Sequence, residues 1–110
     1  VENLKKIYPS IEIIEWGQSP SFDLIINATS LGLNKDDKIK LNYEKLGSSK
    51  FFYDLIYNPN ETNFLLEGKK LGNKIINGKM MFIYQAQLAF NVWHNIVPKI
   101  DSETIKLLNT

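Results

Sequence analysis

The stretch FDLIINA, residues 22–28, decides the fold class, because it is a continuous apolar run bounded by polar residues. Such a run is typical of a strand buried on both faces, as in a parallel sheet covered by helices. A second run, KFFYDLIY at residues 50–57, repeats the pattern. We therefore expect two fully buried parallel strands at the centre of the fold.

The segments around these runs alternate between strand and helix patterns. Residues 11–16 (IEIIEW) have the composition of a strand, and residues 73–78 (NKIING) that of a short edge strand. Helix patterns cover five segments: residues 1–8, 43–46, 63–71, 79–96 and 103–109. Thr62 is expected to cap the third helix, Gly72 to end it, and Asp101 or Ser102 to cap the last one. The alternation predicts an α/β domain with a mainly parallel sheet flanked by helices.

Composition excludes several classes of function. The net charge of +1, with thirteen lysines and no arginine, argues against a nucleic-acid-binding protein. There is no cysteine and one histidine, His94, so we expect no disulfide, no thiolate nucleophile and no metal site. No apolar run approaches the roughly 20 residues of a membrane span, and the start, VENLKKIYPS at residues 1–10, lacks the apolar core of a signal peptide. We expect a cytoplasmic protein without a membrane segment, and the first residue, valine, suggests a piece of a longer chain.

Two strand ends are candidates for a ligand site, because ligands of open parallel sheets bind beyond the carboxyl ends of the strands. Asn27-Ala-Thr-Ser30 follows the first apolar run with small and hydroxyl-bearing side chains, which let a flat ligand approach the backbone. Tyr57 follows the second run. The alternatives are a simple hydrogen-bonded turn and a half-buried tyrosine.

The long helix adds two further candidates. Gln85 lies between Met81 and Ala89 at four-residue spacing, so it should share their apolar stripe. A buried amide without partners costs about 1–3 kcal/mol, so Gln85 needs either a partner in the core or a ligand. Gly78, directly before the helix, permits a close backbone approach or serves as a plain connector.

Other polar groups carry weaker signals. The run Lys35-Asp36-Asp37 lies in a polar loop and is expected to be solvated, because pKa tuning for catalysis needs burial or fixed partners. His94 near a helix end is expected at the surface. The aromatic residues Phe82, Phe90 and Trp93 are expected to form core or a docking face. No Ser-His-Asp arrangement, P-loop or dinucleotide glycine fingerprint occurs.

Taken together, three segments resemble the shikimate dehydrogenase family. DLIINATSLG (23–32), YDLIYNPNETNFL (53–65) and GNKIINGKMMFIYQAQLAFNVW (72–93) occur in the order and at the spacing of that family's motifs. The resemblance covers essentially residues 1–100. It implies an enzyme that reversibly reduces 3-dehydroshikimate to shikimate with NADPH, on the route to chorismate and the aromatic amino acids.

The resemblance also implies a domain arrangement. Residues 1–110 would be the C-terminal part of a Rossmann-like nucleotide-binding domain plus C-terminal helices. These helices would pack back on an N-terminal catalytic domain that lies outside this sequence, as does the glycine-rich loop. The family's catalytic lysine and aspartate belong to that other domain, so no catalytic residue is expected here.

Family contacts transfer to this sequence position by position. The residues implied to touch shikimate are Tyr57 and Gln85. The residues implied to touch NADP are Asn27, Ala28, Thr29, Ser30, Leu55 and Gly78.

Two further expectations follow, and two alternatives stay open. The isolated chain should have no dehydrogenase activity, and exposed apolar surface on the long helix should favour self-association. One alternative is a relative that acts on quinate or on both quinate and shikimate. The other is an α/β module that binds a ligand without catalysis.

Overall fold

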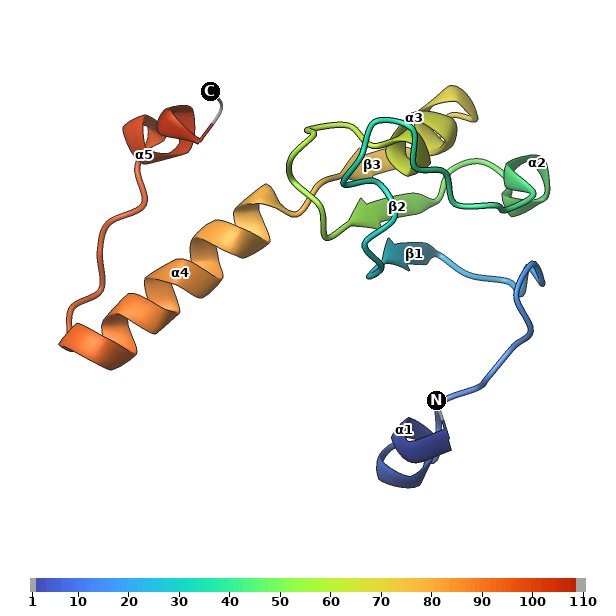
Figure 1. Ribbon diagram of the computed structural model, residues 1–110, viewed down its shortest axis with the longest axis horizontal. Coiled ribbons are helices and arrows are strands. Elements are labelled where there is room, and N and C mark those ends of the chain that lie inside the picture. Colours follow the sequence, from blue (N-terminus) through green and yellow to red (C-terminus); the bar gives the residue numbers. More distant parts are fainter. Residues whose placement is uncertain (1, 109–110) are drawn as a thin grey trace.

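The computed structural model describes residues 2–108 and contains one parallel sheet of three strands in the order β1-β2-β3. The strands are β1 (Leu24–Asn27), β2 (Phe51–Asp54) and β3 (Lys74–Ile76). Helices α2 (Tyr43–Leu46) and α3 (Asn63–Lys70) lie in the two crossovers that parallel pairing requires (Figure 1). The predicted α/β class and the mainly parallel sheet are therefore confirmed.

Three helices lie away from this sheet: α1 (Glu2–Ile7), α4 (Lys79–His94) and α5 (Ser102–Leu107). Figure 1 shows α4 leading outward from the end of β3, with α5 beyond it and α1 at the end of a long extended segment. The radius of gyration is 16.6 Å, against about 13 Å for a compact chain of this length. The sheet with α2 and α3 is thus a small body from which both ends of the chain extend.

The apolar core lies between the sheet and the two crossover helices. Its buried members are Ile39, Leu46, Phe52, Phe64 and Leu65. The rings of Phe52 and Phe64 lie 5.1 Å apart, which seats α3 on β2. A Cβ at position 68 would lie 2.6 Å from the Phe52 ring, so only glycine permits this close contact of helix and strand.

Tyr43 closes the outer side of this core. Its ring packs against Phe52 and Phe64, and its hydroxyl donates a hydrogen bond to the Ile39 carbonyl at 3.1 Å. Burial raises the pKa of Tyr43 to about 12, and the negative charges of Glu67 and Asp54 act in the same direction. The neutral phenol is therefore the form that the folded chain stabilises.

The predicted helix ends agree with the structure. The Thr62 side chain accepts a hydrogen bond from the Leu65 amide at the start of α3, and Gly72 follows that helix with a φ of +80°. The Asp101 side chain caps α5, and its bonds to the Thr104 amide and hydroxyl lower the pKa of its carboxyl. Of the helix expected over 103–109, residue 109 lies outside the described residues.

Two strand predictions are wrong. Residues 11–16 form no strand, because a strand needs a hydrogen-bonded neighbour and this segment pairs with none among the described residues. The first strand is not buried on both faces either, since Leu24 and Ile26 are each 50% exposed. Phe51 of β2 is exposed as well. One face of the sheet carries the core, and the other is largely open.

The raised pKa of Tyr43 predicts a specific alkaline response. Replacing it with phenylalanine should cost about 1 kcal/mol at neutral pH through loss of the bond to Ile39. Because the folded-state pKa lies above the usual value of 10, wild-type stabilisation is complete below pH 10 and is lost as pH rises toward about 12. The difference in unfolding free energy between wild type and Tyr43→Phe, measured by urea titration, should therefore shrink over this range. With exposed Tyr8→Phe as the control, a gap for Tyr43→Phe that stays constant would contradict this account.

Candidate functional site

The candidate site lies at the carboxyl edge of β1 and β2. Asn27 and Asp54 are paired in register as the last residues of the two strands. Directly beyond them, the Leu55 amide donates to the Asn27 carbonyl at 3.1 Å. This pairing places the turn at residues 27–30 next to the segment 55–57, as the position of both at strand ends predicts.

Asn27 organises the turn that follows it. Its side chain is 3% exposed, and its amide nitrogen donates to the Leu31 carbonyl at 3.0 Å and to Asp54 Oδ1 at 3.1 Å. Its side-chain oxygen accepts from the amide and the hydroxyl of Thr29, at 3.0 and 2.7 Å. All the hydrogen-bonding capacity of the Asn27 side chain is used within the chain. Ala28, Thr29 and Ser30 are the exposed residues of the turn.

Asp54 was not singled out by the sequence analysis, yet its carboxylate is the most deeply buried polar group of this edge. It is 0% exposed and accepts three hydrogen bonds. Two reach Oδ1, from Asn27 and from the Ile56 amide, and one reaches Oδ2, from the Thr62 hydroxyl at 2.6 Å. A single acid inside the apolar run FFYDLIY was the available signal, since a charge at such a position must be paired.

Tyr57 lies at the exposed rim of the site. Its side chain is 37% exposed, and its ring stacks on that of Phe82 in α4 with the centroids 4.8 Å apart. Residues three apart on a helix are neighbours, so Gln85 lies one turn beyond Phe82 on the same side of α4. The stack therefore brings Tyr57 to the side of α4 that carries Gln85.

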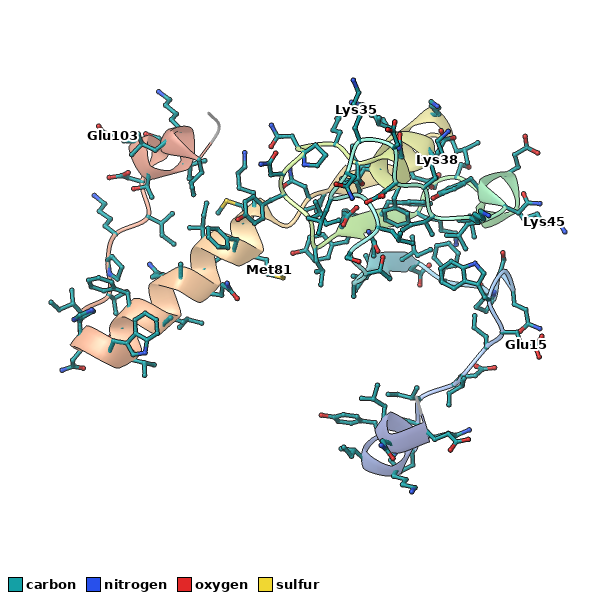
Figure 2. The ribbon with its side chains drawn as sticks, viewed as in Figure 1. Glu15, Lys35, Lys38, Lys45, Met81 and Glu103 are labelled. Carbon is teal, nitrogen blue, oxygen red and sulfur yellow. The ribbon has the colours of Figure 1, made fainter. Side chains whose placement is uncertain are left out.

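The predicted burial of Gln85 is wrong. The residue is exposed, and its side chain forms no hydrogen bond with the rest of residues 2–108, because no other element covers this part of α4. Figure 2 shows side chains projecting along α4 without a covering layer, beginning at Met81. The amide that does find a partner is that of Gln87, which donates to the Pro98 carbonyl at 2.7 Å. The Gln85 side chain is thus left available to a ligand.

Gly78 is needed for the chain's own packing. Its amide donates to the Ile56 carbonyl at 3.1 Å, and a Cβ at this position would lie 1.9 Å from the Leu55 carbonyl oxygen. Its φ is an ordinary −76°, so close approach rather than backbone conformation requires the glycine. At the next residue, Lys79 is buried and donates to the Asn60 side chain at 3.1 Å. These contacts attach the first turn of α4 to the loop after β2.

The loop after the Asn27 turn is ordered by Asp37. One of its carboxylate oxygens accepts from the amides of Asn34 and Gly32, and these bonds lower the pKa of the Asp37 carboxyl. Since the folded-state pKa is depressed, this contribution is present above the usual value of 3.8 and is lost as pH falls below it. Asn63 also donates to the carbonyls of Lys35 and Asp37, which holds the loop against α3. The loop is polar, as predicted, and Lys35 is exposed.

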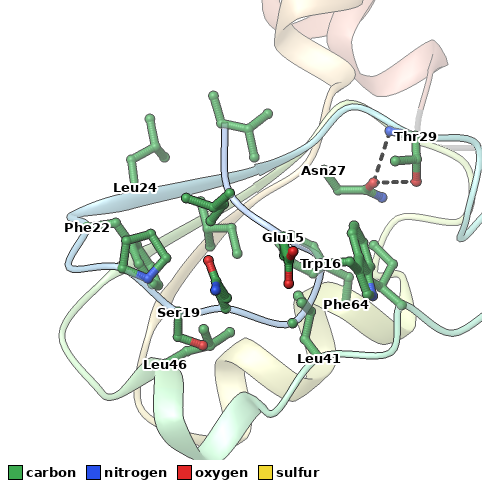
Figure 3. A pocket seen from close by; sticks show the side chains of 17 residues that line it. Glu15, Trp16, Ser19, Phe22, Leu24, Asn27, Thr29, Leu41, Leu46 and Phe64 are labelled. Carbon is green, nitrogen blue, oxygen red and sulfur yellow. Dashed lines mark hydrogen bonds between the residues drawn. The ribbon is translucent and has the colours of Figure 1, made fainter. Parts of the chain in front are cut away.

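An apolar cavity of about 390 Å³ borders the site (Figure 3). It lies between β1 and the segment 14–20, which is tied down by a hydrogen bond from the Trp16 indole to the Lys40 carbonyl at 3.1 Å. Asn27 and Thr29 line part of its wall, while Phe22 and Phe64 contribute to the remainder. The turn at residues 27–30 is therefore flanked by apolar space.

The grouping as a whole is suited to binding and orienting a ligand. The structure brings the turn 27–30, Leu55, Tyr57 and Gly78 together at one edge, with Gln85 on the adjoining helix. The hydroxyls of Ser30 and Tyr57 can each donate or accept a hydrogen bond, whereas the Thr29 hydroxyl already donates to Asn27 and can only accept from a ligand. Within residues 2–108 there is no group of histidines and carboxylates placed to hold a metal ion, and none of the helices described has the length and apolarity to cross a bilayer.

The close approach at Gly78 predicts an unusually costly substitution. Gly78→Ala should destabilise the fold by about 3 kcal/mol, because the new Cβ meets backbone that cannot move aside. The matched change Gly72→Ala has free space around it and incurs only the strain of a positive φ, about 1 kcal/mol. Urea denaturation of both variants checks this, and an equal cost at the two positions would contradict the described packing.

Comparison with known proteins gives shikimate dehydrogenases both among curated sequences and among solved structures. No family model matches the chain. A shikimate dehydrogenase (NADP(+)) of Pelagibacter ubique (strain HTCC1062) is 63% identical over 106 residues, which are 96% of this chain and 40% of that protein. Among solved structures, a shikimate dehydrogenase in complex with NADP+ has a TM-score of 0.69 at 44% identity and covers 78% of this chain. A quinate dehydrogenase from Corynebacterium glutamicum in complex with NAD has a TM-score of 0.65 at 26% identity over 79% of this chain.

The chain is much shorter than these relatives. It spans 40% of the Pelagibacter protein and 30% of each of the two solved structures. Within that span, both the sequence and the path of the chain agree with the relatives. The predicted resemblance is confirmed: over nearly all of its residues, this chain is homologous to a segment of the shikimate dehydrogenase family.

Proposed function

We propose that the chain is the C-terminal part of an NADP-dependent shikimate dehydrogenase, which reversibly reduces 3-dehydroshikimate to shikimate. The observation that carries the proposal is the grouping at the carboxyl edge. The Leu55–Asn27 bond, the Gly78–Leu55 contact and the Tyr57–Phe82 stack bring the cofactor and substrate candidates into one neighbourhood. The 63% identity to the Pelagibacter enzyme supports the same assignment.

The exposed turn fits one face of a nicotinamide nucleotide. Ala28 is small, and Thr29 and Ser30 offer hydroxyls beside half-buried Leu55, so a flat ring can lie against the backbone. NADPH supplies the hydride when it is bound. Asn27 and Gly78 would contribute by shaping this surface, since the Asn27 side chain and the space above Gly78 are occupied by the chain itself.

Tyr57 and Gln85 would hold the substrate in front of that surface. The phenol of Tyr57 can donate to the substrate carboxylate or a ring hydroxyl, and the Gln85 amide can both donate and accept. Fixing the ring carbon against the nicotinamide is a contribution of proximity and orientation, which lowers the barrier without proton transfer from this segment. The proton-transferring residues belong, in this proposal, to an N-terminal catalytic domain.

A second candidate is a dehydrogenase that acts on quinate. The quinate dehydrogenase of similar fold favours it, because quinate and shikimate share the carboxylate and hydroxyl groups that Tyr57 and Gln85 would contact. Turnover of the two acids by the full-length protein separates the candidates. Faster turnover of shikimate with NADP+ is expected. A preference for quinate would instead identify the full-length protein as a quinate dehydrogenase.

The substrate role of Tyr57 predicts the kinetics of one variant. In the full-length protein, Tyr57→Phe should raise the KM for shikimate about tenfold, because a hydrogen bond to a charged group contributes about 1.5 kcal/mol or more. The KM for NADP+ should remain near that of the wild type. Tyr8→Phe removes an exposed phenol far from the site and is the matched control. An unchanged shikimate KM in Tyr57→Phe would show that the Tyr57 hydroxyl does not bind the substrate.

The 110-residue chain alone should be inactive and should self-associate. Leu88, Val92 and Trp93 of α4 are 64%, 80% and 76% exposed, and their burial between copies would be favourable. The sedimentation coefficient should rise with concentration, and Val92→Glu should reduce the rise. Lys99→Glu, which changes charge without removing apolar surface, should have little effect. Shikimate-dependent turnover by this chain, or a monomer at every concentration, would contradict the proposal.

A further inference from the structure

Asp54 makes contacts that no role in ligand binding explains. Its carboxylate is fully buried at the end of β2, where a bound ligand could not reach it, and its three hydrogen bonds are all made within the chain. A buried carboxylate is costly unless it is hydrogen-bonded, and an apolar residue would fill the same position without that cost. Its three hydrogen bonds therefore indicate a geometric function.

One branch of the network begins at Oδ1 and shapes the turn after β1. Asn27 donates to this oxygen at 3.1 Å, which fixes the orientation of the Asn27 amide. The same amide then holds the Thr29 backbone, the Thr29 hydroxyl and the Leu31 carbonyl. The exposed residues 28–30 are thus placed by Asp54 through Asn27.

The other branch closes the loop after β2. The Ile56 amide donates to Oδ1 at 3.0 Å, and the Thr62 hydroxyl donates to Oδ2 at 2.6 Å. These bonds hold the two ends of the segment 56–62, which contains Tyr57, and Leu55 is fixed between Asp54 and Ile56. Because Thr62 also caps α3, the loop is tied to the helix that packs on the core.

We propose that Asp54 is the positioning residue of the site, and that its carboxylate sets the cofactor turn and the substrate tyrosine relative to each other. The inference rests on the proposed function for its catalytic consequence. Substrate and nicotinamide reach reacting distance only if residues 28–30 and Tyr57 keep a fixed separation. A misplacement of about 1 Å can lower a rate on the order of a hundredfold.

The test compares isosteric variants of the full-length protein. Asp54→Asn keeps the shape but offers one acceptor oxygen in place of two, and Thr62→Val removes only the hydroxyl that donates to Oδ2. Thr62→Ser keeps that hydroxyl and is the rescue control. Asp23→Asn makes the same chemical change at an exposed residue before β1. All assays are run at a temperature at which circular dichroism shows every variant folded.

Two readouts separate positioning from a merely structural role. Kinetics should show kcat/KM lowered on the order of a hundredfold in Asp54→Asn, with higher KM values for both NADP+ and shikimate. Thr62→Val should raise mainly the shikimate KM, and Thr62→Ser and Asp23→Asn should resemble wild type. Hydrogen exchange should accelerate in both segments 24–31 and 55–62 in Asp54→Asn, but only in 55–62 in Thr62→Val.

The outcomes distinguish this inference from the proposed function. A folded Asp54→Asn variant with wild-type kinetics and exchange, or with lowered thermal stability alone, would overturn the positioning role. Exchange that accelerates in one segment only would overturn the claim that Asp54 couples the two. If the wild type fails to oxidise shikimate, the proposed function and the catalytic consequence are both overturned, and the exchange data still decide whether Asp54 holds the two segments.

Discussion

The carboxylate of Asp54 joins the turn at Asn27, 27 residues earlier in the chain, to the loop that runs from Ile56 to Thr62. The apolar core around Phe52 and Phe64 seats α3 on the sheet, but contacts of this kind are non-directional. They cannot decide where the loops beyond the strands lie. Directional hydrogen bonds to one buried acid do decide where these loops lie, and every candidate ligand contact except Gln85 lies on the edge that they shape.

Local signals in the sequence predicted what depends on local chemistry. The strands at the two apolar runs, the edge strand before Gly78 and the caps at Thr62 and Asp101 all follow from residues within a few positions of one another. Residues 11–16 and the burial of Gln85 were predicted wrongly for a shared reason. A strand pattern forms a strand, and an apolar stripe becomes buried, only where a partner surface is present, and a local pattern carries no information about the partner.

The sequence grouped the candidate site residues correctly in space, and their roles stay predictions. Motif spacing placed residues 27–30, Leu55, Tyr57 and Gly78 in one set, and the structure brings these residues together. The close approach that Gly78 permits is to the Leu55 backbone, and the Asn27 amide is engaged with its own chain. Asp54 was missed because the motif was interpreted for ligand contacts, although an acid inside an apolar run required buried partners.

The central claim is that one edge of the sheet presents cofactor and substrate to each other. A crystal structure of the full-length protein with NADP+ and shikimate tests it most directly. The nicotinamide is expected against residues 28–30 and Leu55, and shikimate within hydrogen-bonding distance of the Tyr57 hydroxyl and the Gln85 amide. Ligands bound away from this edge, or Tyr57 and Gln85 both without contact to shikimate, would contradict it.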